Sequence, residues 1–495
     1  MKYSDDMNQK ILFIIPSFFY IEDYQRLLYY NDLPLGVLQL SSFLKERANI
    51  ETSIIDLRIE EKKEIYNGLL TDPFDSDAFK GTFIKLLEDI SLQDFEYVAL
   101  SCYTSFQYLY TNVISQVVKE EFPHLSIIVG GYHPTAVPED FTFKGSPIDY
   151  IIRGEAENVL LEIIQDNDRK TIKKTNGKLL PKVLTSETSI DVNSLPFPDY
   201  DLYLRKYHRK TDFNFDFYIS RGCPYQCAFC ATNYSFRCYD FGKFKRDFQR
   251  LCNIAEEYNE NSPKISFADQ SFNRVGIKRK VLEYILKNKL YEKFTFSCQS
   301  RVETVKNNRA LIRLFRRCKM IIGFGFETAS KEMLKIMHKT DDPTHYINMM
   351  KKILQQYKNE GDQYCRINLL SGFPGETSKS FFDTISFLEE NAIHENIQLS
   401  PSLFSNYPNV YVYSNMEDYE KKYGADFIKE WWKLKSNPFK NSVPEMPSKT
   451  YHKKDLINDY KENYIRIIRA FKKSSFKDLV MWKAFYNKWY REYTK

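Results

Sequence analysis

Short apolar runs and amphipathic stretches alternate along the first third of the chain. The apolar runs predict strands at residues 10–16, 51–57, 97–102, 126–129 and 150–153, and helical spacing predicts helices at 35–45, 108–120 and 156–165. Strands that alternate with helices are typical of a parallel, doubly wound sheet. Because such sheets bind ligands beyond the carboxyl ends of their strands, we expect functional loops at that edge.

The alternation stops over residues 171–205, which are polar and contain the proline-rich turn Leu195-Pro-Phe-Pro198, so we interpret them as a linker. It resumes with six runs predicted to be strands, at 215–220, 264–268, 294–298, 321–326, 366–372 and 396–399. Six strand–helix units indicate a partial (β/α)6 TIM-like barrel. We therefore predict an α/β protein with a Rossmann-like domain (1–170), a linker (171–205), a barrel (206–400) and a mostly helical, basic region (401–495).

Composition narrows the class of protein. The 495 residues, 43% hydrophobic and 16% aromatic, can bury more than one core, which argues against a disordered chain. A net charge of +6 does not indicate a nucleic-acid binder. We find neither an apolar run of membrane-spanning length nor a signal peptide, so we expect a cytoplasmic protein without a membrane partner.

The positive charge is concentrated at the C-terminus. Residues 451–495 contain 12 Lys and Arg against 5 Asp and Glu, a net charge of +7. This tail predicts an amphipathic packing helix with a solvated charged face. A surface for an acidic substrate and a nucleic-acid contact are the alternatives.

Three of the nine cysteines form a motif. Cys223, Cys227 and Cys230 have the spacing C-x3-C-x2-C directly after a predicted strand. Thiolates are the usual ligands of iron–sulfur clusters, and three of them leave one iron of a four-iron cluster open. A structural zinc site with Cys238 as fourth ligand is one alternative, and inert thiols are another. The other cysteines, which are expected to be mostly buried small hydrophobic residues, are Cys102, Cys252, Cys298, Cys318 and Cys365.

This cysteine motif resembles that of the radical S-adenosylmethionine (SAM) enzymes. Segments 267–273, 298–301, 322–328 and 370–377 resemble the family's SAM-binding segments in the expected order, although Gln270 replaces an acidic residue. Any one of these segments alone could simply begin or cap a helix. The resemblance implies a [4Fe-4S] cluster on the three cysteines and identifies no catalytic residue. It implies SAM contacts at Phe229, Asp269, Ser300, Arg301, Glu327, Gly372, Gly375 and Glu376.

The N-terminal region resembles the cobalamin-binding subclass of this family. The resemblance lies in residues 31–37, 129–135, 152–157 and 196–200. It implies cobalamin contacts at Ser101, Thr104, Ser105, Gly130, Gly131 and His133. The D-x-H-x-x-G motif is absent after the first strand, which implies cobalamin without a histidine lower ligand. Three alternatives stay open: a structural His133, an ordinary glycine turn, and a domain that no longer binds cobalamin.

Together these resemblances imply a cobalamin-dependent C-methyltransferase that acts on an unactivated carbon. A 5′-deoxyadenosyl radical would remove hydrogen from the substrate carbon, and methylcobalamin would supply the methyl group. A second SAM would then remethylate the cobalt. A non-methylating radical reaction, such as cyclisation, ring contraction or oxidation, is the first alternative, and a non-catalytic, zinc-stabilised binding protein is the second. The expected partners are a small-molecule or peptide substrate and an external electron donor such as flavodoxin or ferredoxin.

Overall fold

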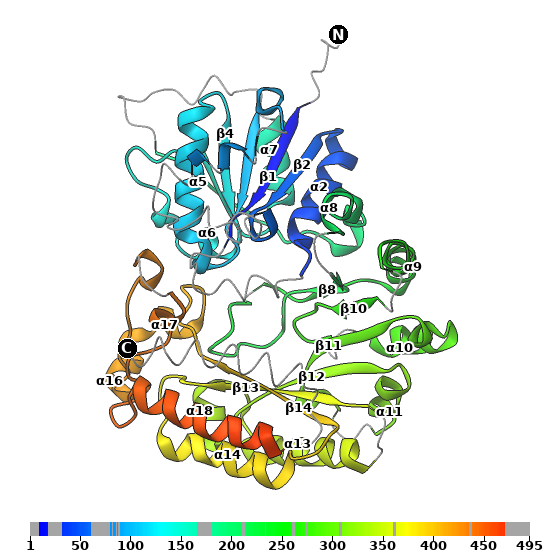
Figure 1. Ribbon diagram of the computed structural model, residues 1–495, viewed down its shortest axis with the longest axis vertical. Coiled ribbons are helices and arrows are strands. Elements are labelled where there is room, and N and C mark those ends of the chain that lie inside the picture. Colours follow the sequence, from blue (N-terminus) through cyan, green and yellow to red (C-terminus); the bar gives the residue numbers. More distant parts are fainter. Residues whose placement is uncertain are drawn as a thin grey trace. The chain divides into compact units, whose positions relative to one another are not determined.

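The chain forms two compact units in a computed structural model (Figure 1). Unit 1 comprises residues 1–213 and 432–438, and unit 2 comprises residues 214–431 and 439–495. Among the described residues, no helix is long and apolar enough to cross a membrane. The structure describes residues 9–17, 32–60, 80–81, 83–85, 87, 90–165, 180–209, 213–232, 234–259, 263–272, 276–305, 309–359, 363–434 and 438–470.

Unit 1 contains a six-stranded parallel sheet with the order β2-β1-β3-β4-β5-β6. This order is that of a doubly wound fold, as the sequence predicted. The central strands are apolar because helices cover both faces of the sheet. The strands are β1 (Lys10–Ile15), β2 (Glu51–Asp56), β3 (Tyr97–Ser101), β4 (Ser126–Gly130), β5 (Tyr150–Arg153) and β6 (Lys182–Thr185).

The helices of unit 1 lie on the two faces of this sheet, with α5 on one side and α2 and α7 on the other (Figure 1). The α-helices are α2 (Leu35–Ala48), α5 (Tyr108–Glu121), α6 (Tyr132–Ala136), α7 (Glu157–Gln165) and α8 (Tyr200–Tyr207). Short 3-10 turns are η2 (Leu92–Asp94), η3 (Ser105–Gln107), η4 (Pro138–Asp140) and η6 (Val192–Ser194). Two of these turns, η3 and η4, lie close to the carboxyl ends of β3 and β4.

The segment expected to be a linker is part of unit 1 where it is described. Its strand β6 extends the sheet beside β5, and the Gln39 Nε2 donates a hydrogen bond of 2.8 Å to the Pro196 carbonyl. In α8, the Tyr203 hydroxyl donates to Asp56 Oδ2 at 2.6 Å. The sequence did not reveal β6 because this edge strand is mostly exposed and has no apolar pattern.

Unit 2 contains a second six-stranded parallel sheet, with the order β14-β13-β12-β11-β10-β7. Strands β7 and β14 do not pair, so the barrel is partial, as predicted. Its strands are β7 (Asn214–Phe217), β10 (Lys264–Phe267), β11 (Thr295–Arg301), β12 (Met320–Glu327), β13 (Cys365–Ser371) and β14 (Ile397–Leu403), and a small ladder joins β8 (Ser220–Arg221) to β9 (Arg237–Cys238).

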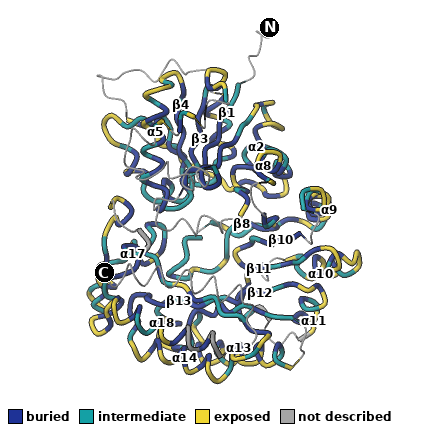
Figure 2. Tube along the Cα trace, in the orientation of Figure 1, coloured by how far each residue is buried: buried dark blue, intermediate teal, exposed yellow. Residues whose placement is uncertain are grey.

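The helices of unit 2 are amphipathic, and Figure 2 shows them buried on one side and exposed on the other. The α-helices are α9 (Phe241–Tyr258), α10 (Lys278–Lys287), α11 (Arg309–Arg317), α12 (Lys331–Ile336), α13 (Pro343–Asn359), α14 (Ser378–Asn391), α15 (Tyr411–Ser414), α16 (Met416–Tyr423), α17 (Pro438–Ser442) and α18 (Lys453–Ala470). The 3-10 turns are η8 (Leu290–Glu292) and η9 (Val302–Val305), and a third, η10 (Trp431–Lys433), begins in unit 2 and ends in unit 1. The basic tail beyond residue 470 lies outside the described residues.

The core of unit 2 fixes which face of each strand points outward, toward the helices. Phe217 of β7 and Phe296 of β11 both pack on Phe248 of α9, with ring centroids 5.6 Å and 6.2 Å apart. Because side chains alternate along a strand, the neighbours of these phenylalanines point to the opposite, inner face of the partial barrel. Polar residues at those alternate positions therefore line its interior.

Candidate active site

The three cysteines lie on a loop that begins directly after β8. Gly222 opens it with φ of 75°, and a Cβ there would lie 2.4 Å from the Tyr234 carbonyl oxygen, so the turn requires glycine. The Cys230 N–H donates to the Cys227 carbonyl at 3.0 Å, which closes a tight turn. All three thiols are partly exposed and none forms a disulfide. Cys238 instead lies in β9, opposite Ser220 in the ladder.

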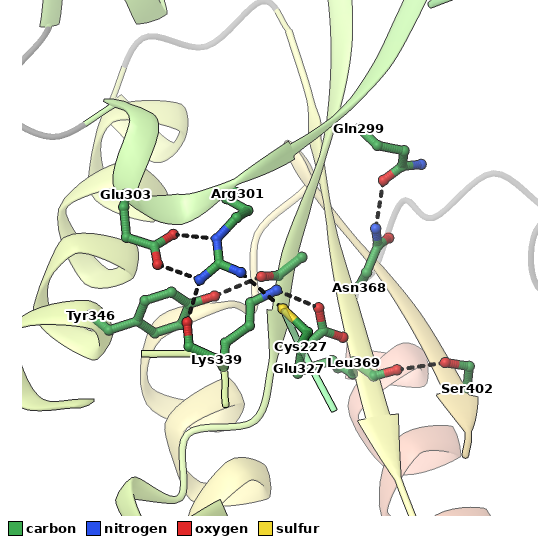
Figure 3. Close-up of polar contacts among 11 residues, drawn as sticks. Cys227, Gln299, Arg301, Glu303, Glu327, Lys339, Tyr346, Asn368, Leu369 and Ser402 are labelled. Atoms are coloured by element: carbon green, nitrogen blue, oxygen red, sulfur yellow. Dashed lines mark hydrogen bonds and ion pairs between the residues drawn. The ribbon is translucent and has the colours of Figure 1, made fainter. Parts of the chain in front are cut away.

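Arg301, at the end of β11, faces this loop (Figure 3). Its Nη1 lies 3.0 Å from the Cys227 sulfur, and its guanidinium stacks 3.8 Å above the Tyr225 ring. Glu303 accepts hydrogen bonds of 2.6 Å and 3.2 Å from the same guanidinium, and the Lys339 carbonyl accepts a further one. Arg301 is therefore held by several partners with one edge toward a thiol.

A second cation, Lys339, lies beside the loop. Its ammonium group pairs with Glu327 at 2.9 Å and lies 5.5 Å from the centroid of the Phe229 ring. Burial raises the pKa of the Cys227 thiol, while Lys339 and Arg301 act in the opposite direction. The two cations therefore favour a thiolate at Cys227 that burial alone would disfavour.

Glu327 lies at the end of β12 with an unusual backbone. Its φ is 67°, a left-handed conformation that is uncommon for residues other than glycine. A Cβ on Gly325 would lie 2.9 Å from Glu327 Oε1 and 3.2 Å from Lys339 Nζ, so the glycine leaves space for the ion pair. The hydroxyl of Tyr346 donates to the Gly325 carbonyl at 2.6 Å (Figure 3).

The two other acids predicted to contact SAM are buried and bonded to backbone. Asp269 accepts hydrogen bonds from the Ile219 N–H at 3.2 Å and from the Ser220 hydroxyl, just before the cysteine loop. Glu376 accepts from the Gly372 N–H within the turn after β13. Burial raises the pKa of Asp269 to about 7 and that of Glu376 to about 8. Both acids therefore shape loops at the carboxyl edge of the sheet.

The remaining residues predicted to contact SAM lie at the same edge. Gly372 and Gly375 have φ of 78° and 97°, so both require the conformational freedom of glycine. Ser300 is buried on β11, and its hydroxyl has no hydrogen-bond partner among the described residues. Ser300 lies four residues after Phe296 and therefore shares the outward face of β11.

In unit 1, the loops after β3 and β4 meet in a buried polar network. His133 Nδ1 lies 2.8 Å from the Ser105 hydroxyl, and its Nε2 lies 3.2 Å from Asp140 Oδ2. Trp432 Nε1 donates to Asp140 Oδ2 at 2.6 Å, and Lys433 pairs with Asp140 Oδ1 at 2.6 Å. Both ring nitrogens of His133 are thus engaged by protein groups.

The charges of this network set the tautomer of His133. Burial alone would raise the pKa of Asp140, but hydrogen bonds from His133, Lys433 and Trp432 hold it below its usual value. Burial lowers the pKa of His133, which favours the neutral ring. Since ionised Asp140 can only accept, Nε2 carries the ring hydrogen and Nδ1 accepts from Ser105.

Gly131 brings the loops after β3 and β4 together. Its φ is 121°, and a Cβ there would lie 2.4 Å from the Cys102 carbonyl oxygen. Ser101 pairs in register with Gly130, and Thr104 directly precedes η3. The residues predicted to contact cobalamin therefore share the carboxyl edge of the sheet, where doubly wound folds bind ligands.

Several residues of these sites carry no sequence signal. Lys339, Trp432 and Lys433 lie in no motif, and Trp432 reaches Asp140 across 292 residues of sequence. Asp140 follows the motif around His133 but matches no ligand pattern. Only the tertiary structure brings these side chains together. The five other cysteines are all buried, as predicted.

Comparison with known proteins assigns the chain to a family. Residues 29–164 match the model of the B12 binding domain, and residues 217–388 match that of the radical SAM superfamily. The chain belongs to the radical SAM enzymes that contain a B12-binding domain. The radical SAM domain implies a [4Fe-4S] cluster and SAM, and the B12-binding domain implies cobalamin. This finding favours the cluster over a structural zinc at the cysteine loop.

Three curated relatives are 22–26% identical to the chain over the regions that align. An uncharacterized methyltransferase, PH0819, of Pyrococcus horikoshii is 26% identical over 72% of this chain and 73% of its own. The anaerobic magnesium-protoporphyrin IX monomethyl ester cyclase of Cereibacter sphaeroides is 22% identical over 61% of this chain. The cobalamin-dependent radical SAM methyltransferase TokK of Streptomyces tokunonensis is 25% identical over 61% of this chain. The chain spans 50% and 46% of the lengths of the latter two proteins.

A solved structure has a similar fold. The cobalamin-dependent SAM radical enzyme OxsB, solved with aqua-cobalamin bound, superposes with a TM-score of 0.56. The match covers 84% of this chain and 56% of OxsB at 17% sequence identity, so it supports the fold.

The residues of the radical SAM domain fit a cluster and SAM. The loop presents three thiols, the soft ligands that iron–sulfur clusters use. Among the described residues, no three His, Cys, Asp or Glu side chains surround a single metal ion. A cluster does not need such convergence, because each thiolate binds a different iron.

Proposed function

We propose that this protein is a cobalamin-dependent C-methyltransferase that acts on an unactivated carbon. One observation carries the proposal: the cysteine loop and its two cations lie at the carboxyl edge of a radical SAM sheet, in a chain that also contains a B12-binding domain. Methyltransferases among the named relatives support the choice of reaction. A substrate and an external electron donor, such as a flavodoxin or ferredoxin, are the partners that this chemistry requires.

Each residue around the cluster then has a distinct task. Cys223, Cys227 and Cys230 hold the [4Fe-4S] cluster, and Arg301 and Lys339 compensate its negative charge. When bound, the cluster supplies the electron that cleaves SAM, and cobalamin supplies the methyl group. Residues that would contact SAM directly are Phe229, Arg301 and Glu327, and Gly372 and Gly375 would shape the turn after β13. Asp269 and Glu376 act as positioning residues that set the shape of the loops.

In the B12-binding domain, the loops after β3 and β4 face the cobalamin. We assign contacts to Ser101, Thr104, Gly130 and Gly131. The hydrogen bond between Ser105 and His133 joins the two loops. Both ring nitrogens of His133 bond to protein side chains, so His133 would not serve as a ligand of the cobalt. The described residues thus support cobalamin binding without a histidine ligand.

The test is anaerobic turnover of protein reconstituted with iron, sulfide and cobalamin. One methyl transfer consumes two SAM molecules and two electrons. It releases equal amounts of methylated product, methionine, 5′-deoxyadenosine and S-adenosylhomocysteine. A substrate that gains no methyl group while 5′-deoxyadenosine forms would instead indicate a non-methylating reaction, such as that of the cyclase among the relatives.

A triple variant, Cys223→Ala, Cys227→Ala and Cys230→Ala, tests the cluster assignment. We expect it to lose bound iron, the visible absorption of the cluster and SAM cleavage. Cys238→Ala is the matched control, since Cys238 lies nearby on β9, and it should retain all three properties. Iron binding by the triple variant would contradict the assignment.

A further inference from the structure

We propose that Gln299 and Asn368 form a recognition site for an amide group of the substrate. The inference rests on the proposed function, because it places a substrate group inside the radical SAM barrel. It assigns a chemical class to a substrate that the comparisons do not identify. The two side chains lie on β11 and β13, which are separated by β12.

Both side chains point into the partial barrel. Phe296 of β11 packs on α9, so Gln299, three residues later, lies on the inner face, and its side chain is exposed. Phe324 of β12 packs on Tyr357 of α13, and Ile367 is its partner in register. Asn368, next to Ile367, therefore also points inward.

The inner face is polar along the strands around this pair. Asp216 of β7, Ser266 of β10 and Ser400 of β14 lie at inward positions, and Ser400 pairs in register with Asn368. Strand β12 contributes Gly323 and Gly325 at its inward positions. Such a lining suits a substrate that forms hydrogen bonds, since burying polar groups against an apolar ligand is costly.

A glycine permits the two amides to meet across the intervening strand. Asn368 Nδ2 donates to Gln299 Oε1 at 2.6 Å (Figure 3). Gly323 lies in register with Gln299, and a Cβ there would lie only 2.4 Å from Gln299 Oε1. The side chain of Gln299 thus passes over β12 through the space that Gly323 leaves open.

One amide nitrogen, a donor, and one amide oxygen, an acceptor, are available to a ligand. Gln299 Nε2 and Asn368 Oδ1 bond to no other described residue and lie on the same side of the shared hydrogen bond (Figure 3). If both amide groups were turned so that oxygen and nitrogen exchanged places, one amide nitrogen and one amide oxygen would still be available to a ligand. An amide presents the opposite pair, a carbonyl and an N–H, and a cyclic amide presents them on one edge.

The pair also lies close to the reaction centre. Gln299 precedes Arg301 by two residues and shares its face of β11, so their Cα atoms are about 7 Å apart. Arg301 contacts the cysteine loop directly. A substrate anchored by its amide at this pair would therefore extend toward the site of SAM cleavage.

Three matched probes test the site on reconstituted holoprotein. They are 2-pyrrolidone, N-methyl-2-pyrrolidone, which lacks the N–H, and γ-butyrolactone, which replaces the amide with an ester. Ligand-observed saturation-transfer NMR would give their relative affinities. We expect 2-pyrrolidone to bind up to about tenfold more tightly than the other two, which corresponds to the net free energy of about one hydrogen bond.

Variants then localise the binding. Gln299→Met and Asn368→Leu keep the approximate side-chain volume and remove the amides, and each should weaken 2-pyrrolidone binding about tenfold. Glu390→Gln, at an exposed position of α14 outside the barrel lining, is the control and should not change the affinity. Equal binding of all three probes, no binding of 2-pyrrolidone, or unchanged affinity in both variants would overturn the inference.

The outcome is separable from the test of the proposed function. Iron content and formation of 5′-deoxyadenosine report on the radical SAM activity, and lactam binding reports on the amide pair. Active protein that does not discriminate the lactam refutes only the amide site. Protein that binds the lactam selectively but does not cleave SAM refutes only the proposed activity.

Discussion

Replacing Glu376 with glutamine should stabilise the protein at alkaline pH. Glu376 lies in the turn after β13, is 1% exposed, and accepts a hydrogen bond from the Gly372 N–H. Burial raises the pKa of this carboxyl group from 4.5 to about 8. Glutamine has nearly the same shape, keeps an oxygen for the Gly372 N–H, and carries no charge. Glu376→Gln therefore mimics the protonated side chain at every pH.

The pKa shift fixes the sign and size of the effect. A carboxyl group with a raised pKa binds its proton more tightly in the folded state, so stability falls as pH rises from about 4.5 to about 8. At 1.36 kcal/mol for each unit, the full shift corresponds to an upper limit of about 5 kcal/mol. The wild-type protein should carry this cost at pH 8.5 and the variant should not.

Urea unfolding of both proteins at pH 5.5, 7.0 and 8.5 would measure the difference. The advantage of Glu376→Gln should be small at pH 5.5 and should grow with pH. Glu390→Gln is the control, because Glu390 is exposed on α14 and its replacement should leave the pH profile unchanged. A wild-type stability that rises between pH 5.5 and 8.5 relative to the variant would refute the reasoning.

Two further predictions concern the B12-binding domain. Asp140→Asn should destabilise the protein by about 3 kcal/mol, because it removes the buried charge that pairs with Lys433 and accepts from His133 and Trp432. It should also weaken cobalamin binding in a spectroscopic titration, whereas the Glu390→Gln control should match wild type in both measurements. Gly131→Ala should cost more than about 2 kcal/mol in urea unfolding, because alanine is strained at φ of 121° and its Cβ would meet the Cys102 carbonyl. Gly36→Ala, where nothing lies within 4 Å of an added Cβ, is its control, and equal stability of the two variants would contradict this account.

The strands were predictable because parallel strands covered on both faces are nearly continuous apolar runs. The run predicted at 10–16 is β1 (Lys10–Ile15), and that at 321–326 is β12 (Met320–Glu327). Strand β6 escaped prediction for the converse reason. It lies at the sheet edge with most of its side chains exposed, so it needs no apolar pattern. The polar stretch 171–205, whose sequence predicts a linker, therefore contains a strand, β6, that extends the sheet.

The candidate sites were predictable only where their residues are close in sequence. Three cysteines within eight residues identify themselves by spacing. Lys339 and Trp432 instead reach their sites through tertiary packing, and their neighbours in sequence contain no related motif. His133 illustrates the opposite case, in which the motif is visible in the sequence but the hydrogen-bond partners of the residue are not. Its motif resembled a cofactor contact, but the partners of its ring, Ser105 and Asp140, are side chains that no spacing rule connects.

Asp269 and Glu376, two acids in segments that resemble SAM-binding motifs, are both buried and hydrogen-bonded to protein groups. Asp269 and Glu376 hold loops at the edge where the cysteines lie, and burial raises the pKa of Asp269 to about 7 and that of Glu376 to about 8. Near neutral pH, Glu376 therefore keeps its proton and Asp269 keeps it about half of the time. Arg301 and Lys339, which lie beside the cysteine loop, also form ion pairs with Glu303 and Glu327. If Cys223, Cys227 and Cys230 hold a cluster as proposed, ionised Asp269 and Glu376 would add two negative charges to the same edge of the sheet and oppose reduction of the cluster. Burial thus allows these carboxyl groups to shape the loops with less electrostatic cost to electron transfer.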